Sequence, residues 1–330
     1  MSLPVIICDD SALARKQLAK SLPGGWDISL TFANNGQEAL DAIKQGKGDL
    51  VFLDLNMPVM DGYETLEAIR RENLDSLVIV VSGDIQAEAK KRVMALGALE
   101  FITKPINQEL VTSILLRYGI INNSQPQTSA ELARFDDQQP DLTDLVQEVV
   151  NVAMGQAGKL LGGLLGTFVH LPIPQVYLQP YQQLPSLIAI RKALTYSGVS
   201  QGFIGSGIAG EAMMIISTDS LPILAKLLPS SLQDTQASEL EILTDLTGLL
   251  AGACLKGISQ QLDVQFSLGH PALLGQHTEL HKLLGENQQL VLAINLDYQL
   301  PEKGIQCDLL LVFTEDSLPA LTERLGCLNE

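Results

Sequence analysis

Two acidic residues and an amide residue lie at helical spacing in the middle of the chain. Asp144, Glu148 and Asn151 occupy positions i, i+4 and i+7, which places them on one face of a helix. A carboxamide both donates and accepts hydrogen bonds, so Asn151 could hold a water molecule in line for attack without acting as a base. Glu148 could pair with a cation on a partner. We interpret this face as a recognition surface, with solvated residues on an exposed helix side as the alternative.

The same frame returns 97 residues later with different chemistry. The matched pairs are Asp144 and Glu241, Glu148 and Asp245, Asn151 and Gly248, and Pro174 and Pro271. Because glycine has no side chain to hold water, we expect catalysis at the second copy to be weak or absent. Its remaining acidity leaves partner binding there open.

Polar side chains follow the apolar runs in the N-terminal third of the chain. They are Asp9, Asp10, Asp54, Ser82 and Lys104. The carboxyl ends of parallel strands meet at one edge of a sheet, so we expect these side chains to converge. Two or three carboxylates form a hard oxygen site suited to Mg²⁺. With the metal in place, Asp54 can accept a phosphoryl group whose oxygens Lys104 and Ser82 stabilise.

The elements that must position this cluster alternate between strands and helices over residues 1–119. Five strands separated by helical stretches predict an α/β domain with a parallel sheet covered on both faces. The expected strands are Val5–Cys8, Ile28–Thr31, Leu50–Leu53, Leu77–Val81 and Leu99–Thr103, and the first two helices are Ala12–Leu22 and Gln37–Lys44.

The rest of the chain divides into a polar linker and a repeated unit. Residues 121–139 are poor in apolar side chains, which indicates a linker. From residue 140 to residue 330, the 97-residue offset fits four separate segments, which predicts two repeats at about 141–230 and 238–328. Each repeat should contain a long helix, strands and a closing helix. We expect an α+β domain in which the repeats pack with a pseudo-two-fold around one shared sheet.

Composition narrows the class of protein. The chain has 330 residues and a net charge of −17, and it lacks the clustered Lys and Arg that a nucleic-acid-binding face needs. Its four cysteines form no C-x-x-C pair, which indicates buried thiols in a reducing compartment. The N-terminus does not resemble a signal peptide, and no apolar run reaches the roughly 20 residues of a membrane span. We expect a cytoplasmic protein without membrane insertion.

The first domain, residues 1–120, resembles a two-component response-regulator receiver domain. The motifs are Asp9-Asp10, Asp54-Leu-Asn56-Met-Pro58 with Asp61-Gly62, Ser82, and Phe101-Ile-Thr-Lys104-Pro105. The resemblance implies a (βα)5 flavodoxin-like, doubly wound fold, a histidine kinase as phosphoryl donor and Asp54 as phosphoacceptor. It implies that Asp9, Asp10, Asp54 and the Asn56 backbone carbonyl hold Mg²⁺. It also implies that Ser82 and Phe101 form the switch pair and that the Lys104–Pro105 bond is cis.

Residues 140–330 resemble the CheC/CheX/FliY family of chemotaxis phosphatases, which hydrolyse aspartyl phosphate on receiver domains. The spacing Asp-x3-Glu-x2-Asn-x22-Pro fits Asp144, Glu148, Asn151 and Pro174 without a gap. The resemblance implies that Asn151 positions the attacking water and that Glu148 bonds the lysine of the substrate receiver. Asp144 and Pro174 would support the geometry. Glu241, Asp245, Gly248 and Pro271 form the degenerate second site.

The two resemblances together predict a signal-transduction protein. Phosphorylation of Asp54 regulates a CheC-like phosphatase domain, whose substrate is a phosphorylated response regulator of chemotaxis type. The phosphatase face could instead act on its own Asp54. Two functions without phosphatase activity remain open: a non-catalytic interaction module switched by the receiver, and a phosphate sink that competes for the kinase. The sequence does not indicate the oligomeric state.

Overall fold

The computed structural model describes residues 2–121, 142–171, 173–188, 195–227, 239–284, 288–300 and 304–326. The chain folds into two compact units, Met1–Asp144 and Leu145–Glu330. The linker predicted at residues 121–139 lies outside the described residues except for Ile121. The side chain of Ile121 is buried in the core of the first unit.

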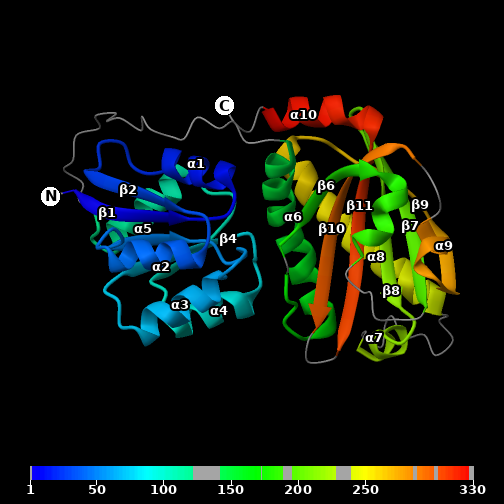
Figure 1. Ribbon diagram of the computed structural model, residues 1–330, viewed down its shortest axis with the longest axis horizontal. Coiled ribbons are helices and arrows are strands. Elements are labelled where there is room, and N and C mark those ends of the chain that lie inside the picture. Colours follow the sequence, from blue (N-terminus) through cyan, green and yellow to red (C-terminus); the bar gives the residue numbers. More distant parts are fainter. Residues whose placement is uncertain are drawn as a thin grey trace. The chain divides into compact units, whose positions relative to one another are not determined.

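The first unit is built on a parallel sheet of five strands (Figure 1). The strand order is β2-β1-β3-β4-β5, and every neighbouring pair is parallel. β1, β3 and β4 are nearly continuous runs of buried Val, Ile, Leu and Phe, as expected of strands covered on both faces. The strands are β1 (Leu3–Cys8), β2 (Ile28–Ala33), β3 (Leu50–Leu53), β4 (Leu77–Ser82) and β5 (Glu100–Thr103). The predicted flavodoxin-like parallel sheet is confirmed.

Helices cover both faces of this sheet and enclose two hydrophobic cores. α1 and α5 pack on one face, and α2, α3 and α4 pack on the other (Figure 1). The helices are α1 (Ala12–Lys20), α2 (Gly36–Lys44), α3 (Gly62–Arg71), α4 (Ala87–Leu96) and α5 (Gln108–Arg117). Ser11, Asn35, Asp61 and Asn107 cap four of these helices, each accepting a hydrogen bond from a backbone N–H in the first turn.

Gly62 lets α3 begin directly against the segment that follows β3. A Cβ at this position would collide with the backbone oxygen of Asp54 and the Cα of Leu55. We therefore expect Gly62→Ala to lower the free energy of unfolding by about 1–3 kcal/mol, because backbone cannot yield as a side-chain tip can. Urea denaturation measures this loss. Gly24→Ala is the control, since a Cβ there meets open space. An equal effect of both substitutions would contradict the steric explanation.

The second unit combines a six-stranded antiparallel sheet with helices. The strand order is β6-β10-β11-β8-β7-β9, and all strand pairs are antiparallel. The strands are β6 (Gln175–Pro180), β7 (Tyr196–Gly205), β8 (Ile208–Ser217), β9 (Ser267–Thr278), β10 (Leu290–Leu300) and β11 (Ile305–Thr314). The helices are α6 (Leu142–Leu165), α7 (Leu221–Leu227), α8 (Glu239–Leu262), α9 (Leu280–Leu284) and α10 (Leu318–Gly326). The expectation of an α+β unit is confirmed.

The 97-residue offset relates these elements in pairs. The bounds of α6 and α8 differ by 97 residues at both ends, as do those of β8 and β11. At the same offset, β6 falls within β9 and β7 overlaps β10. Replacing each strand by its partner reverses the strand order and leaves the sheet unchanged. The two halves of the unit therefore occupy equivalent places in one sheet.

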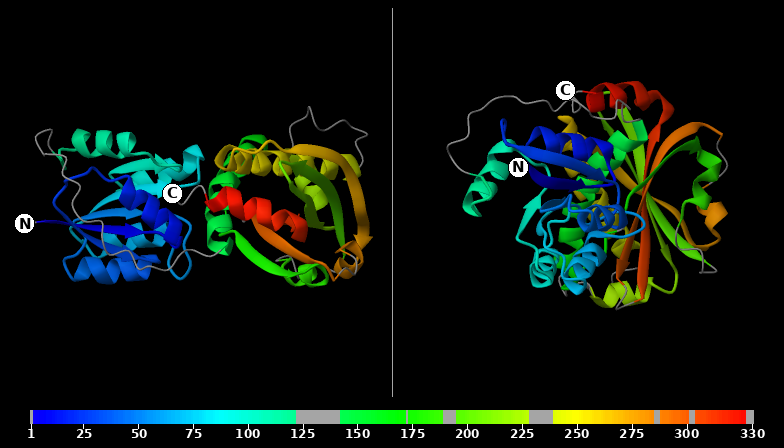
Figure 2. Two further views of the ribbon diagram at one scale, coloured as in Figure 1. Left: turned by 90° about the horizontal axis from the view of Figure 1, so that it is seen from above. Right: turned by 60° about the vertical axis from the view of Figure 1, so that its left-hand side comes forward.

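The long helices α6 and α8 cross and contact each other (Figure 2). The Gln261 Nε2 donates to the Val149 carbonyl at 2.7 Å, and a Cβ on Gly257 would lie 2.6 Å from the Cα of Ala153. α8 is long and apolar enough to cross a membrane by length and composition alone. Half of its apolar window is buried inside the fold.

Candidate functional site

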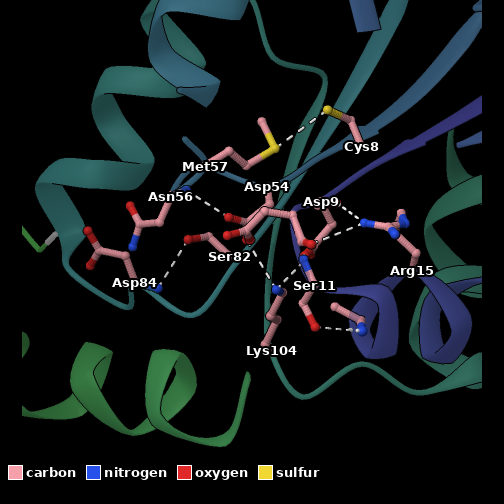
Figure 3. Close-up of polar contacts among 12 residues, drawn as sticks. Cys8, Asp9, Ser11, Arg15, Asp54, Asn56, Met57, Ser82, Asp84 and Lys104 are labelled. Atoms are coloured by element: carbon pink, nitrogen blue, oxygen red, sulfur yellow. Dashed lines mark hydrogen bonds and ion pairs between the residues drawn. The ribbon is translucent and has the colours of Figure 1, made fainter. Parts of the chain in front are cut away.

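The strand-end residues of the first unit converge at one edge of the sheet (Figure 3). Asp54 follows β3, and its Oδ2 accepts a hydrogen bond from the Asn56 backbone N–H at 2.7 Å. The Lys104 Nζ lies 3.2 Å from the Asp54 Oδ1 and 2.8 Å from the Asp9 Oδ2. Asp54 is 1% exposed. A buried aspartate is thus held beside a cation that can neutralise charge developing on its oxygen.

Backbone geometry fixes Lys104 in this place. Its N–H donates to the Ser82 carbonyl at 2.9 Å, which continues the pairing of β4 and β5. The Lys104–Pro105 peptide bond is cis, as the resemblance implies. Ser82 is fully buried, and its Oγ accepts a hydrogen bond from the Asp84 N–H at 3.1 Å. Lys104, Ser82 and Asp54 are therefore set by three adjacent strands.

Phe101 is buried in the core on the side of the sheet covered by α2, α3 and α4. It pairs in register with Val80, two residues before Ser82 along β4. Its ring has no hydroxyl, so it can respond to changes at Ser82 only through packing. Its proposed partnership with Ser82 stays a prediction.

Two residues of this edge were not predicted from the sequence. Arg15 on α1 donates from its Nη1 to the carbonyls of Asp9 and Asp10, at 2.6 and 3.2 Å. Asp84 is buried, and desolvation raises its pKa to about 6, although hydrogen bonds from Gln86 oppose the rise. Both residues lie beyond the strand ends, so a search confined to those ends misses them.

The oxygen donors that would hold Mg²⁺ lie at this same edge. Asp9 and Asp54 both contact Lys104, so their carboxylates face a common point, and Asp10 follows Asp9 directly. Within the described residues, no three carboxylate, imidazole or thiol side chains are gathered closely enough to hold a metal ion by themselves. Carboxylate and carbonyl oxygens are the ligands Mg²⁺ prefers, and it retains waters in its remaining positions. The donor set therefore suits a hydrated Mg²⁺.

In the second unit, α6 carries the acid and amide residues on one helix. Glu148 and Asn151 are each 6% exposed, whereas Asp144, one turn before Glu148, is exposed. Within the described part of the chain, the Asn151 Oδ1 has no hydrogen-bond partner. Such a buried acceptor costs about 1–3 kcal/mol when nothing donates to it. Pro174 is buried immediately before β6.

The matched positions on α8 have a different environment. Glu241 and Asp245 are exposed, and Gly248 is half-buried. Pro271 is exposed within β9, where it pairs in register with Gln201 of β7. The buried amide of α6 thus has no side-chain counterpart on α8.

Comparison with known proteins identifies the first unit. A family model for the response regulator receiver domain matches residues 5–116. The five-stranded parallel sheet and the cluster around Asp54 agree with this match. The N-terminal unit is therefore a receiver domain of two-component signalling.

Individual relatives share this part of the chain. The transcriptional regulatory protein ZraR of Escherichia coli O157:H7 is 26% identical over 196 residues, covering 58% of this chain and 44% of that protein. A protein-glutamate methylesterase/protein-glutamine glutaminase of Treponema pallidum is 38% identical over 110 residues, covering 32% of this chain and 27% of that protein. The chain therefore spans less than half the length of these relatives.

Solved structures show weaker overall similarity. Thermotoga maritima FliY is 16% identical, with a TM-score of 0.42, covering 58% of this chain and 99% of that chain. A CheX–CheY–BeF3–Mg complex from Borrelia burgdorferi is 28% identical, with a TM-score of 0.33, covering 36% of this chain and 90% of that chain.

Proposed function

We propose that the chain is a receiver-regulated phosphatase that hydrolyses aspartyl phosphate on response regulators, most directly those of chemotaxis type. A histidine kinase phosphorylates Asp54, and this modification controls the second unit. The observation that carries the proposal is the carboxamide of Asn151, buried on α6 with an acceptor oxygen that has no partner among the described residues. Its spacing from Asp144, Glu148 and Pro174 fits the motif of the phosphatase family.

At the receiver, the residues have distinct proposed roles. Asp54 provides the carboxylate oxygen that takes up the phosphoryl group, and Lys104 and Ser82 stabilise the phosphoryl oxygens. Asp9, Asp10, Asp54 and the Asn56 carbonyl would hold Mg²⁺, which when bound neutralises charge on the phosphoryl group. Lys104 already contacts two carboxylates at 2.8 and 3.2 Å, so its charge is in place before a phosphoryl group arrives.

At the second unit, α6 acts on the phosphorylated aspartate of a substrate receiver. The Asn151 carboxamide orients a water molecule, which attacks phosphorus as the bond from phosphorus to the aspartate oxygen breaks. The products are inorganic phosphate, which takes up both hydrogens of the water, and a free aspartate carboxylate. Glu148 anchors the complex by pairing with the lysine of the substrate receiver. Asp144 and Pro174 support the helix and its approach to the sheet.

The proposal is tested by following the decay of phosphorylated chemotaxis receivers with and without the full chain. We expect the chain to accelerate the decay of at least one receiver in a panel. Equal decay in the presence and absence of the chain would leave the interaction module as the better description. Repeating the assay with Asp54 unphosphorylated and phosphorylated shows whether the receiver unit controls the rate.

A further inference from the structure

Arg15 connects helix α1 to the short segment that carries two carboxylates of the receiver unit. A single nitrogen of its guanidinium, Nη1, donates to the Asp9 carbonyl at 2.6 Å and to the Asp10 carbonyl at 3.2 Å (Figure 3). Arg15 lies in the first half of α1 and is half-buried. The side chain therefore reaches back from the helix to the backbone that precedes it.

The two carbonyls that Arg15 contacts lie between the hydrogen-bond networks of a strand and a helix. β1 ends at Cys8, and the backbone hydrogen bonds of α1 begin at the Ser11 carbonyl, which accepts at 3.1 Å. Carbonyls withdrawn from water need a donor as much as those within a strand or helix do. For Asp9 and Asp10, which fall between the two elements, the guanidinium provides it.

The carboxylate of Asp9 is already oriented by contacts of its own. Its Oδ1 accepts from the Ser11 backbone N–H at 2.9 Å, and its Oδ2 accepts from the Lys104 Nζ at 2.8 Å. With the side chain fixed in this way, the place of the carboxylate depends on where its backbone is held. Asp10 continues the same backbone, so the two hydrogen bonds from Arg15 constrain the point from which each carboxylate projects.

The charge of Arg15 and its hydrogen bonds have opposite consequences for a cation at this edge. A guanidinium is always charged, and like charges repel, so its charge alone weakens the binding of Mg²⁺ beside it. Its hydrogen bonds act the other way, because they hold the backbone of two residues that would contribute carboxylate ligands. The sign of the change in Mg²⁺ affinity when Arg15 is replaced therefore tells which of the two effects is larger.

We propose that Arg15 is a positioning residue for the Mg²⁺ site of the receiver unit. By holding the carbonyls of Asp9 and Asp10, it keeps their carboxylates arranged for the cation. The inference rests on the proposed function for the identity of the metal, and it does not depend on hydrolysis at α6. Partners of metal ligands typically contribute about 10–100-fold in metal affinity. Arg15 contacts the backbone of the ligands and not their carboxylates, so we expect the lower end of that range.

Three substitutions on α1 separate the hydrogen bonds from the charge. Arg15→Met removes both and keeps a long apolar stem that is well tolerated in a helix. Arg15→Lys keeps the charge and one nitrogen with three N–H donors, which can serve both carbonyls as Nη1 does. Lys20→Met removes an equal charge from an exposed position in the last turn of the same helix. Urea denaturation of each variant establishes that it is folded under the conditions of the assay.

Binding is measured by isothermal titration calorimetry of the full chain with Mg²⁺, without a phosphoryl donor. Arg15→Met should weaken binding by about tenfold, the lower end of the effect of losing a partner of the metal ligands. Arg15→Lys should stay within about threefold of wild type because the donor and the charge are retained. Lys20→Met should bind as tightly as wild type or more tightly, since it removes only a repelling charge. Unchanged or tighter binding by Arg15→Met would overturn the inference.

The rate of phosphorylation by acetyl phosphate gives a second readout. The Mg²⁺ concentration for half-maximal rate should rise about tenfold in Arg15→Met, in step with its affinity, while the rate at saturating Mg²⁺ stays near that of wild type. A lower rate at saturating Mg²⁺ with an unchanged half-maximal concentration would contradict a positioning role.

The inference and the proposed function fail separately. Weaker Mg²⁺ binding by Arg15→Met in a chain that hydrolyses no receiver would uphold the inference and reject the phosphatase. Equal Mg²⁺ binding by Arg15→Met and wild type would reject the inference alone. The absence of Mg²⁺ binding by wild type would reject the metal assigned to the receiver unit, and the role of Arg15 with it.

Discussion

Replacing Asn151 with alanine is expected to reduce the rate of receiver dephosphorylation by about 100-fold or more, the usual cost of removing one group that orients or stabilises a reacting centre. The side chain contributes a donor and an acceptor at one point, and alanine contributes neither. The measurement is the first-order decay of phosphate from a purified phosphorylated receiver at saturating concentrations of wild type and variant. Because the substitution disturbs the orientation of the attacking water, it should lower kcat and leave binding of the receiver largely unchanged.

The control for this substitution is a second amide on the same helix. Gln156 of α6 donates to the Gln260 Oε1 of α8 at 3.0 Å, so its amide has a structural partner. Gln156→Ala should leave the hydrolysis rate within about twofold of wild type, since it removes only a peripheral hydrogen bond. If both variants hydrolyse the receiver as fast as wild type, Asn151 has no role in catalysis and α6 serves only for contact.

The receiver fold could be predicted from sequence because its signals are local. β3 is a continuous apolar run of four residues followed at once by Asp54, and the observed bounds match the predicted ones. The carboxyl ends of parallel strands lie at the same edge of a sheet. The contact between Asp54 and Lys104 could therefore be predicted from their positions directly after two strands. Arg15 could not be found in this way. Its contact with the carbonyls of Asp9 and Asp10 depends on how α1 packs against the end of β1.

In the second unit, the repeat and the acid and amide residues of its first helix could be predicted from the sequence, but the contacts between distant elements could not. The offset between α6 and α8 could be read from matched residues, and the structure gives the two helices the same lengths. The proximity of Gly248 to Gln201 could not be predicted, because Gln201 lies in the middle of β7 and meets α8 only where the helix packs against the sheet. The sequence shows directly that α8 lacks the amide that α6 carries. Only the folded structure shows that a different amide, that of Gln201, lies near Gly248.

Replacing Asp54 with asparagine is expected to abolish phosphorylation of the receiver unit, because an amide cannot serve as the attacking carboxylate. Incubation with acetyl phosphate and Mg²⁺, followed by intact-protein mass measurement, should detect a phosphorylated species in wild type and none in Asp54→Asn. The fold should persist, since Lys104 keeps its contact with the Asp9 Oδ2 at 2.8 Å. Removing the lysine instead would leave two buried carboxylates beside one another, at a cost of about 3–5 kcal/mol.

A second buried aspartate at the same edge of the sheet provides a control for Asp54→Asn. Its replacement by asparagine removes a carboxylate there but leaves Asp54 in place. Asp84 is 4% exposed, but its carboxylate accepts hydrogen bonds from the backbone N–H and the side-chain amide of Gln86. The Asp84→Asn variant should therefore still be phosphorylated at Asp54. Only the Asp54→Asn variant cannot be phosphorylated. The rate at which this variant hydrolyses phosphate on a separate receiver can therefore be compared with the rate of wild type under phosphorylating conditions. A difference between the two rates, in either direction, establishes that Asp54 controls α6. Identical rates would show that the receiver does not regulate the second unit, even if that unit is active. The coupling free energy between phosphorylation of Asp54 and the activity of the second unit would then be zero.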